Sequence, residues 1–86
     1  MLHEYRKKTT IKAEQFDGSE YMMKKYSIND LNYIGVGVRI GPPHYRLPTK
    51  EGIMSLHTGD WIATGIDAEH WAIADDIFRR TYERCD

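Results

Sequence analysis

Three histidines recur at intervals of 13 residues in the second half of the chain, at His44, His57 and His70. In an antiparallel meander the start of one strand lies beside the end of the next, which places His44 near His57, with Asp60 close by. Two neutral imidazoles and a carboxylate form a donor set that suits zinc or a similar ion. Histidines on half-exposed strands are nevertheless common without a metal, so we expect no metal site.

A glycine-rich run from Gly35 to Gly41 has the spacing G-x-G-x-x-x-G. Phosphate binding needs free backbone N–H groups at a helix N-terminus. This run falls inside a predicted strand, whose ladder uses those groups. Elsewhere in the sequence, no spacing of residues suggests a nucleophile beside a general base. Cys85, the single cysteine, is next to the last residue. We therefore expect a chain with no catalytic activity and no bound cofactor.

The strongest local cluster of charge lies near the N-terminus, where Arg6, Lys7, Lys8 and Lys12 occur within one short segment. Strand alternation would place Arg6, Lys8 and Lys12 on one face, where they could contact the phosphates of a nucleic acid. Lysines on an edge strand also protect it from aggregation, and this explanation is the simpler one. Nucleic-acid binding through this face is therefore the alternative function.

Aromatic residues are plentiful, with two tryptophans, six tyrosines and two phenylalanines. A small sheet cannot bury ten rings, and the rings we expect to be exposed are Tyr21, Tyr26, Tyr33 and Tyr45. Exposed tyrosine beside arginine is typical of protein interfaces, although an ordinary solvated hairpin can have the same composition. Residues 33–47 combine both types around a rigid Gly-Pro-Pro turn. The expected partner-binding residues are Tyr33, Arg39, Tyr45 and Arg46.

Periodicity and turn residues predict about six strands and two short helices. The expected strands are 5–16, 33–40, 44–49, 53–57, 60–64 and 69–73, and the expected helices are 20–26 and 75–83. Asp17 would cap the first helix, with Glu20 completing a capping box. In the second strand one face would carry Ile34, Val36, Val38 and Ile40. The predicted class is α+β, with a small antiparallel curled sheet or open barrel and two short helices.

Length and composition bound the remaining possibilities. With 86 residues the chain has room for a single domain, residues 1–86. The net charge of −1 argues against a dedicated nucleic-acid binder. The opening MLHEYRKKTT has no apolar run typical of a signal peptide, and no segment has the length of a membrane span. We therefore expect a cytoplasmic protein with no membrane contact.

Both ends of the chain resemble a family of small phage and prophage proteins. The opening match is Tyr5-Arg6-Lys7-Lys8 with Gln15-Phe16-Asp17-Gly18, although Thr9 stands where the family usually has proline. The later match comprises Glu51-Gly52, Gly59-Asp60-Trp61-Ile62, Gly65, Glu69, Asp76-Ile77-Phe78 and Thr81-Tyr82-Glu83. Asp75 replaces the usual proline, and the turn at Asp67-Ala68 lacks the family's second glycine. The resemblance covers about half of the chain.

The resemblance implies a shared scaffold and a phage accessory protein in the cytoplasm of a host bacterium. Small phage proteins of this kind often bind and inhibit or redirect host proteins, including defence systems. The leading hypothesis is therefore a non-catalytic module that binds a host protein. A homodimer is also compatible with the exposed strand edges that such a small sheet leaves open.

Overall fold

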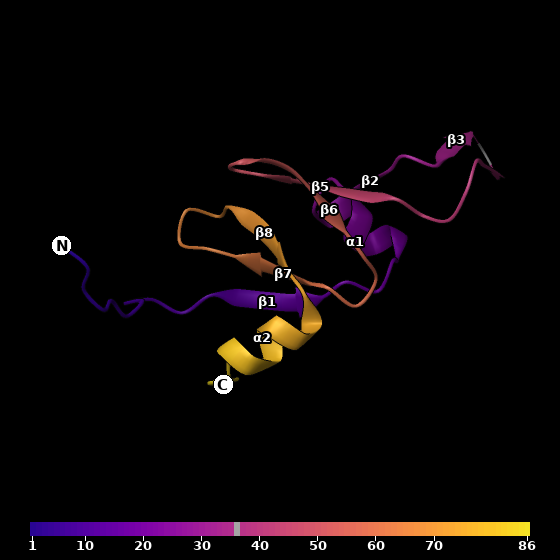
Figure 1. Cartoon of the computed structure of the whole chain (residues 1–86). Coiled ribbons are helices and arrows are strands. Elements are labelled where there is room, and N and C mark those ends of the chain that lie inside the picture. The colour runs from indigo at the N-terminus through magenta and orange to yellow at the C-terminus, as the bar shows by residue number, and fades with distance from the viewer. Residues whose placement is uncertain (36) are drawn as a thin grey trace.

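The computed structural model describes residues 1–35 and 37–86 (Figure 1). Within these residues the chain is a small α+β protein with three small open sheets and two short helices. All strand pairs are antiparallel. The elements are β1 (Lys12–Gln15), α1 (Glu20–Lys25), β2 (Asn29–Asp30), β3 (Tyr33–Gly35), β4 (Val38–Arg39), β5 (Tyr45–Thr49), β6 (Gly52–Leu56), β7 (Trp61–Thr64), β8 (His70–Ile73) and α2 (Asp75–Thr81).

The expected curled sheet or open barrel was wrong. The described strands divide into a β1-β7-β8 sheet, a β2-β5-β6 sheet and the separate β3-β4 pair. The division falls between β6 and β7, where the turn ending at Gly59 (φ +101°) carries the chain from one sheet to the other. The predicted strand 33–40 is itself split, because β3 turns back onto β4. Val36, which we expected on the apolar face of that strand, lies outside the described residues.

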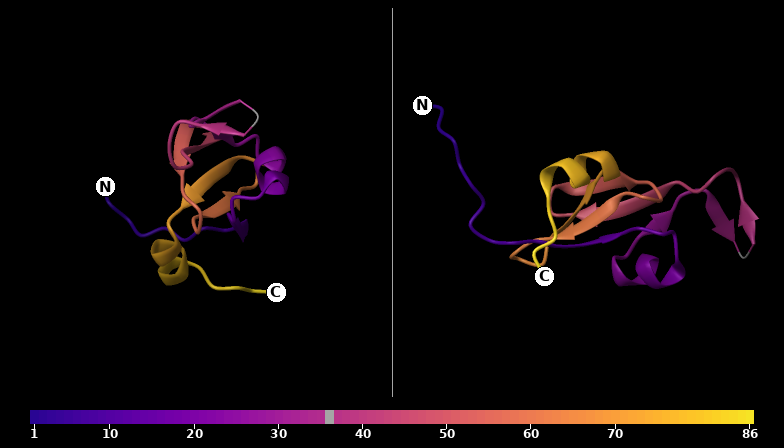
Figure 2. Two further views of the ribbon diagram at one scale, coloured as in Figure 1. Left: turned by 90° about the vertical axis from the view of Figure 1, so that its right-hand side faces the viewer. Right: turned by 90° about the horizontal axis from the view of Figure 1, so that it is seen from below.

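The β1-β7-β8 sheet has different neighbours on its two faces (Figure 2). On one face Ile62 is fully buried and belongs to the main core. On the other face Trp61 stacks on Phe78 of α2, with ring centroids 4.1 Å apart. The Trp61 indole N–H also donates to Asp75 Oδ1 over 2.8 Å, at the start of α2. The sheet therefore separates the core from the C-terminal helix.

The hydrophobic core lies between this sheet, the β2-β5-β6 sheet and α1. Phe16 and Tyr45 meet edge to face at its centre, with centroids 4.9 Å apart. Tyr26 is 7% exposed and Tyr45 is 9% exposed, so the expectation that these two rings face solvent was wrong. Tyr21 and Tyr33 are exposed as expected. The buried cluster comprises Phe16, Met22, Tyr26, Ile28, Tyr45, Leu47, Leu56 and Ile62.

Helix α1 begins at Glu20, as expected, but Asp17 is not its capping residue. Ser19 is the N-cap, and its hydroxyl accepts a hydrogen bond from the Met22 N–H. Asp17 instead accepts from the Ser19 N–H, which fixes the turn that leads into the helix. Ser27 then adopts a left-handed conformation (φ +57°) that ends the helical path. The short strand β2 follows in a segment that we expected to be loop.

The N-terminal strand is much shorter than predicted. Only Lys12–Gln15 pair with β7, and residues 1–10 are exposed and form no strand. These ten residues extend away from the folded body (Figure 1). Alternation alone could not reveal this, because β7 is only four residues long and offers no partner beyond Thr64.

The turn between β7 and β8 keeps its shape without a second glycine. Ala68 occupies the left-handed region at φ +60°, where glycine is the residue that fits without strain. Its N–H donates to the Gly65 carbonyl, and the Gly65 N–H donates to the Glu69 carbonyl. The pairing of β7 with β8 therefore holds Ala68 in the left-handed conformation that the turn requires.

The molecule is elongated, with extents of 51 × 30 × 22 Å. Its radius of gyration is 15.0 Å, against about 12 Å for a compact domain of this length. The N-terminal segment and the β3-β4 hairpin account for the excess, since both lie outside the body in Figure 1. Among the described residues, no helix has the length and hydrophobicity needed to cross a bilayer.

Candidate functional site

The β3-β4 hairpin is held out from the body as a finger, defined here as residues 31–35 and 37–40 (Figure 1). Its stem is closed by two backbone hydrogen bonds, from Leu31 N to His44 O (3.0 Å) and from Ile40 N to Asn32 O (2.8 Å). The Asn32 side-chain amide also donates to the Pro42 carbonyl over 2.6 Å. The Gly-Pro-Pro turn therefore braces the stem of the finger.

A buried carboxylate anchors the finger to the β2-β5-β6 sheet. The Asp30 side chain is 4% exposed, and its Oδ2 lies 2.6 Å from Arg39 Nη1, an ion pair that does not have the alignment of a hydrogen bond. Asp30 Oδ1 accepts the N–H groups of Asn32 and His44, each over 3.0 Å. Burial raises the pKa of Asp30, but these two N–H groups and Arg39 outweigh it and hold the pKa below its usual value.

The finger exposes several large apolar side chains. Ile34 is 62% exposed and Ile40 is 66% exposed. The Tyr33 ring lies beside the Arg39 guanidinium, with the guanidinium carbon 5.9 Å from the ring centroid. The exposed apolar side chains of the finger are Leu31, Tyr33, Ile34, Val38 and Ile40. A cluster of this kind, next to an arginine, has the composition of a protein interface.

The four predicted partner-binding residues do not form one surface. Tyr33 and Arg39 face each other across the finger, in register as β-strand partners. Arg46 lies on β5 opposite Asn29 and is half-buried, and its Nε has no hydrogen-bond partner among the described residues. Tyr45 is a core residue. The candidate contact surface on the finger therefore includes Tyr33 and Arg39 and excludes Tyr45.

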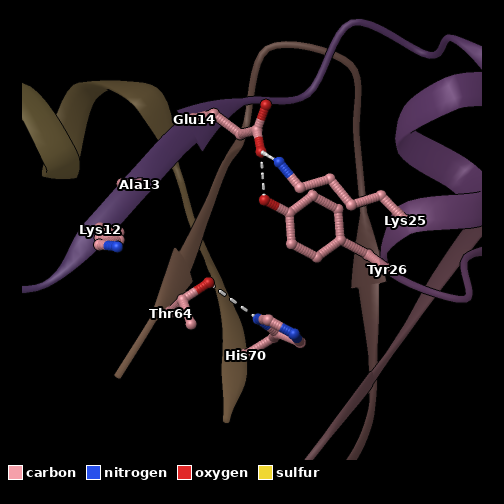
Figure 3. A pocket seen from close by; sticks show the side chains of 7 residues that line it. All are labelled: Lys12, Ala13, Glu14, Lys25, Tyr26, Thr64 and His70. Atoms are coloured by element: carbon pink, nitrogen blue, oxygen red, sulfur yellow. Dashed lines mark hydrogen bonds and ion pairs between the residues drawn. The ribbon is translucent and has the colours of Figure 1, made fainter. Parts of the chain in front are cut away.

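A second feature is an open hollow of about 380 Å³ beside α1 (Figure 3). One end holds Glu14 of β1, whose Oε2 lies 2.5 Å from Lys25 Nζ and accepts a hydrogen bond from the Tyr26 hydroxyl. The other end holds Thr64 and His70. The lining residues are Lys12, Ala13, Glu14, Lys25, Tyr26, Thr64 and His70.

The charges at the Glu14 end are fixed by mutual contact. Hydrogen bonds from Lys25 and then from Tyr26 lower the pKa of Glu14. Burial, followed by the bond to Glu14, raises the pKa of Tyr26 to about 12. The bond to Glu14 also raises the pKa of Lys25. At neutral pH the cluster is therefore a carboxylate, a neutral phenol and an ammonium, which ties α1 to β1 but leaves no group to exchange protons.

At the Thr64–His70 end of the hollow, a hydroxyl lies within hydrogen-bond distance of an imidazole, as a nucleophile and its base do in some enzymes. Thr64 Oγ1 and His70 Nδ1 are 2.9 Å apart, and the Tyr26 ring meets the imidazole edge to face with centroids 4.9 Å apart. A nucleophile and base of this kind also need a group that orients the imidazole. No carboxylate hydrogen-bonds His70 among the residues that the structure describes. The pair is better explained as a polar link between β7 and β8.

The histidine set considered for zinc does not converge. His57 Nδ1 lies 3.5 Å from Asp60 Oδ2, while His44 donates its backbone N–H to Asp30 Oδ1. His70 is at the far end of the other sheet, beside Tyr26. Within the described ranges no group of three histidine, cysteine or acidic side chains is arranged to hold a metal.

The basic N-terminal residues are exposed but do not share a strand face as predicted. Arg6 and Lys8 belong to the extended segment, and Lys12 alone lies in β1. The Lys7 side chain reaches back to the sheet, with its Nζ over the Trp71 ring, 5.1 Å from the ring centroid. Neither Arg6 nor Lys8 forms an ion pair with a described residue, so both cations face solvent.

Sequence reasoning missed the two polar anchors, Asp30–Arg39 and Glu14–Tyr26–Lys25. The signal for the second was present, because Met22 and Tyr26 are one helical turn apart and an amphipathic helix must place both towards the sheet. The first had no local signal, since it depends on the chain reversing between β3 and β4. The chain matches no protein-family model, no curated protein and no solved structure.

Proposed function

We propose that this chain is a non-catalytic binding module whose finger contacts another protein. The observation that carries the proposal is the exposure of an apolar cluster on a hairpin that is braced at its stem and anchored by Asp30. Exposed apolar surface normally costs solubility, and a protein retains it where a partner covers it. The bracing fixes the hairpin before binding, which reduces the conformational entropy lost on association.

The resemblance at both ends of the chain adds the biological setting to this proposal. It suggests a phage or prophage accessory protein that binds a host protein and modulates or inhibits it, with defence proteins among the candidate targets. The finger lies in the central segment, where the resemblance lapses. A shared scaffold with its own central hairpin is consistent with a family in which each member binds a different target.

The test is an affinity pull-down from lysate of the host bacterium, using the tagged chain with and without nuclease. The contact variant is Tyr33→Ala with Ile34→Ser, because both side chains are exposed and neither joins the core. The control is Ile66→Ser, which removes an even more exposed apolar side chain from the β7-β8 turn. We expect a stoichiometric host protein that survives nuclease, is lost with the finger variant and is retained with the control.

Two results would contradict this proposal. Retention of the same partner by a folded finger variant would move the contact elsewhere on the molecule. Absence of any partner would remove the evidence for a binding module. Arg39→Ala is a poorer probe, because it also leaves Asp30 without its cation, and Tyr45→Ala acts on the core rather than on the surface.

The alternative function is nucleic-acid binding by the exposed N-terminal segment. The unpaired side chains of Arg6 and Lys8 favour it, because solvent-facing cations on an extended arm can follow a phosphate backbone. It predicts salt-dependent binding of DNA or RNA that Arg6→Ala with Lys8→Ala weakens. No binding at about 50 mM salt would exclude it.

A further inference from the structure

Strand β6 presents an open edge with none of the usual protection. It pairs with β5 through five consecutive residue pairs without a bulge, and no strand pairs with its other side in the described part of the chain. Its sequence, Gly-Ile-Met-Ser-Leu, contains no charge and no proline. Natural edges are commonly blocked by lysine, proline or a bulge, since an unprotected edge recruits another strand.

Pro48 shows which backbone groups point outwards. Proline has no N–H, so the Pro48–Ile53 pair belongs to the set of antiparallel pairs that exchange no hydrogen bonds. The Arg46–Ser55 pair, two residues along, belongs to the same set. The N–H and C=O groups of Ile53 and Ser55 therefore face the open edge. Neither residue has another backbone or side-chain partner within the described residues.

We propose that this edge binds a second copy of the chain, with β6 pairing antiparallel to β6 about a two-fold axis. In the self-complementary register Ile53 of each copy lies opposite Ser55 of the other, and Met54 lies opposite Met54. All four outward-facing groups of each copy are then satisfied. Two β2-β5-β6 sheets become one continuous sheet across the dimer, and Ile53, which is 63% exposed, gains a cross-strand neighbour.

Charge favours a second copy over an unrelated strand. The same register places Glu51 of one copy opposite His57 of the other, twice, by symmetry. Both residues are exposed, at the two ends of β6. A carboxylate facing an imidazole is favourable whether the imidazole donates a hydrogen bond or carries a charge. Between these ends the strand carries no charge, so the two-fold axis creates no like-charge pair along β6.

Sedimentation velocity over a range of about 10 μM to about 1 mM tests whether the chain dimerises by mass action. We expect a monomer–dimer equilibrium that Ser55→Pro shifts at least tenfold towards monomer. Proline there removes an outward N–H and leaves the bonds to β5 in place. Ser55→Ala keeps the N–H and should dimerise as the parent does. A monomer throughout the range, or full dimerisation of a folded Ser55→Pro variant, overturns the proposal.

Disulfide trapping tests the register even if the proline variant fails to fold. In a Cys85→Ser background, Met54→Cys places two thiols on a facing pair about 4.5 Å apart at Cα, within disulfide range. Ile53→Cys places them on a diagonal, about 7–8 Å apart. Mild oxidation should covalently dimerise the first variant and leave the second monomeric. Equal trapping of both variants, or of neither, contradicts this register.

The dimer edge and the finger are separate surfaces, so the two proposals can fail independently. Ser55→Pro should still bind the finger's partner in a pull-down. The finger variant Tyr33→Ala with Ile34→Ser should still dimerise. A single change that abolished both activities in a folded protein would contradict this separation.

Discussion

Arg39 of the finger and Asp30 of the adjacent sheet form an ion pair in which one partner is buried and the other half-exposed, with 2.6 Å between Nη1 and Oδ2. Asp30 also accepts two backbone N–H groups, so one carboxylate fixes both the turn at Asn32 and His44, the residue before β5. The Asp30 side chain therefore adds to the hydrogen bonds of the stem in setting the orientation of the finger.

Asp30→Ala should destabilise the protein by about 2 kcal/mol, because it leaves two backbone N–H groups without their acceptor and the Arg39 guanidinium without its counter-ion. Urea unfolding followed by circular dichroism measures the change. Asp67→Ala is the control, since the Asp67 carboxylate is exposed and lies 3.8 Å from Lys50. Equal effects of the two substitutions would show that Asp30 does not anchor the finger.

The Glu14–Tyr26 bond predicts a pH dependence with two limbs. The pKa of Glu14 is lower in the folded protein than its ordinary value of 4.5. Its contribution to folding stability is therefore fully present above pH 4.5 and is lost as the pH falls through the folded pKa. The pKa of Tyr26 is raised from 10.0 to about 12, so the neutral phenol stabilises the fold below 10 and this contribution is lost between 10 and about 12.

Tyr26→Phe should therefore lower stability at neutral pH by about 1.5–3 kcal/mol, the range for a hydrogen bond to a charged group. It should also flatten the alkaline limb, apart from the part that Lys25 contributes through its own raised pKa. Urea midpoints measured across pH, with Tyr21→Phe as the matched control, provide the comparison. An unchanged alkaline limb in the Tyr26 variant would be evidence against the assigned bond.

Tyr45→Ala should cost about 3 kcal/mol or more, because it opens a cavity against Phe16 at the centre of the core. Tyr21→Ala removes the same side chain from an exposed position and should change stability by less than about 0.5 kcal/mol. Thermal unfolding of the two variants separates core from surface. A near-neutral Tyr45→Ala variant would restore Tyr45 as a surface candidate.

Helix α2 should be the least stable part of the body, since none of its residues is buried. Phe78→Ala removes the stack on Trp61 and should release the helix, with a red shift of tryptophan fluorescence and faster hydrogen exchange in residues 75–81. Ile77→Ala, on the exposed side, should leave both signals unchanged. Protection of the helix in a folded Phe78→Ala variant would assign its docking to the Asp75 contacts instead.

Ala68→Gly should stabilise the protein by up to about 1 kcal/mol, because it relieves a left-handed conformation that L-residues adopt at a cost. The gain is partly offset by the extra freedom that glycine has in the unfolded chain. The melting temperature measures the balance. A clear loss of stability would mean that the alanine methyl group makes a compensating contact.

The sequence predicted the β5-β6 hairpin, β7, β8 and both helices to within a few residues, because alternation and turn residues are local signals. It failed at 33–40, where one apolar alternation fits either a long strand or a hairpin that reverses near Gly37. The glycines contained that information, since Gly37 has φ +73°, but a glycine in a strand is equally compatible with close packing.

The candidate site was predicted in part for a related reason. Tyr33 and Arg39 come together because the hairpin closes, which their spacing alone does not require. Tyr45 was misplaced because its exposure depends on which face of β5 meets the β1-β7-β8 sheet, and strand alternation is symmetrical between the two faces. The burial of a side chain depends on how the strands and helices pack together, and the sequence pattern of one strand carries no information about that packing.

The finger meets the body only at a short stem, and the Cβ position of Gly37 near its tip opens onto free space. Its length and side chains can therefore change without disturbing the core, at the small entropic cost of a longer loop. The body therefore acts as a scaffold, and the finger is a part of it that can be exchanged. Replacing the residues between Tyr33 and Arg39 with a different hairpin tip, while keeping the stem and the Asp30–Arg39 ion pair, should redirect the molecule to a new target without changing how it folds.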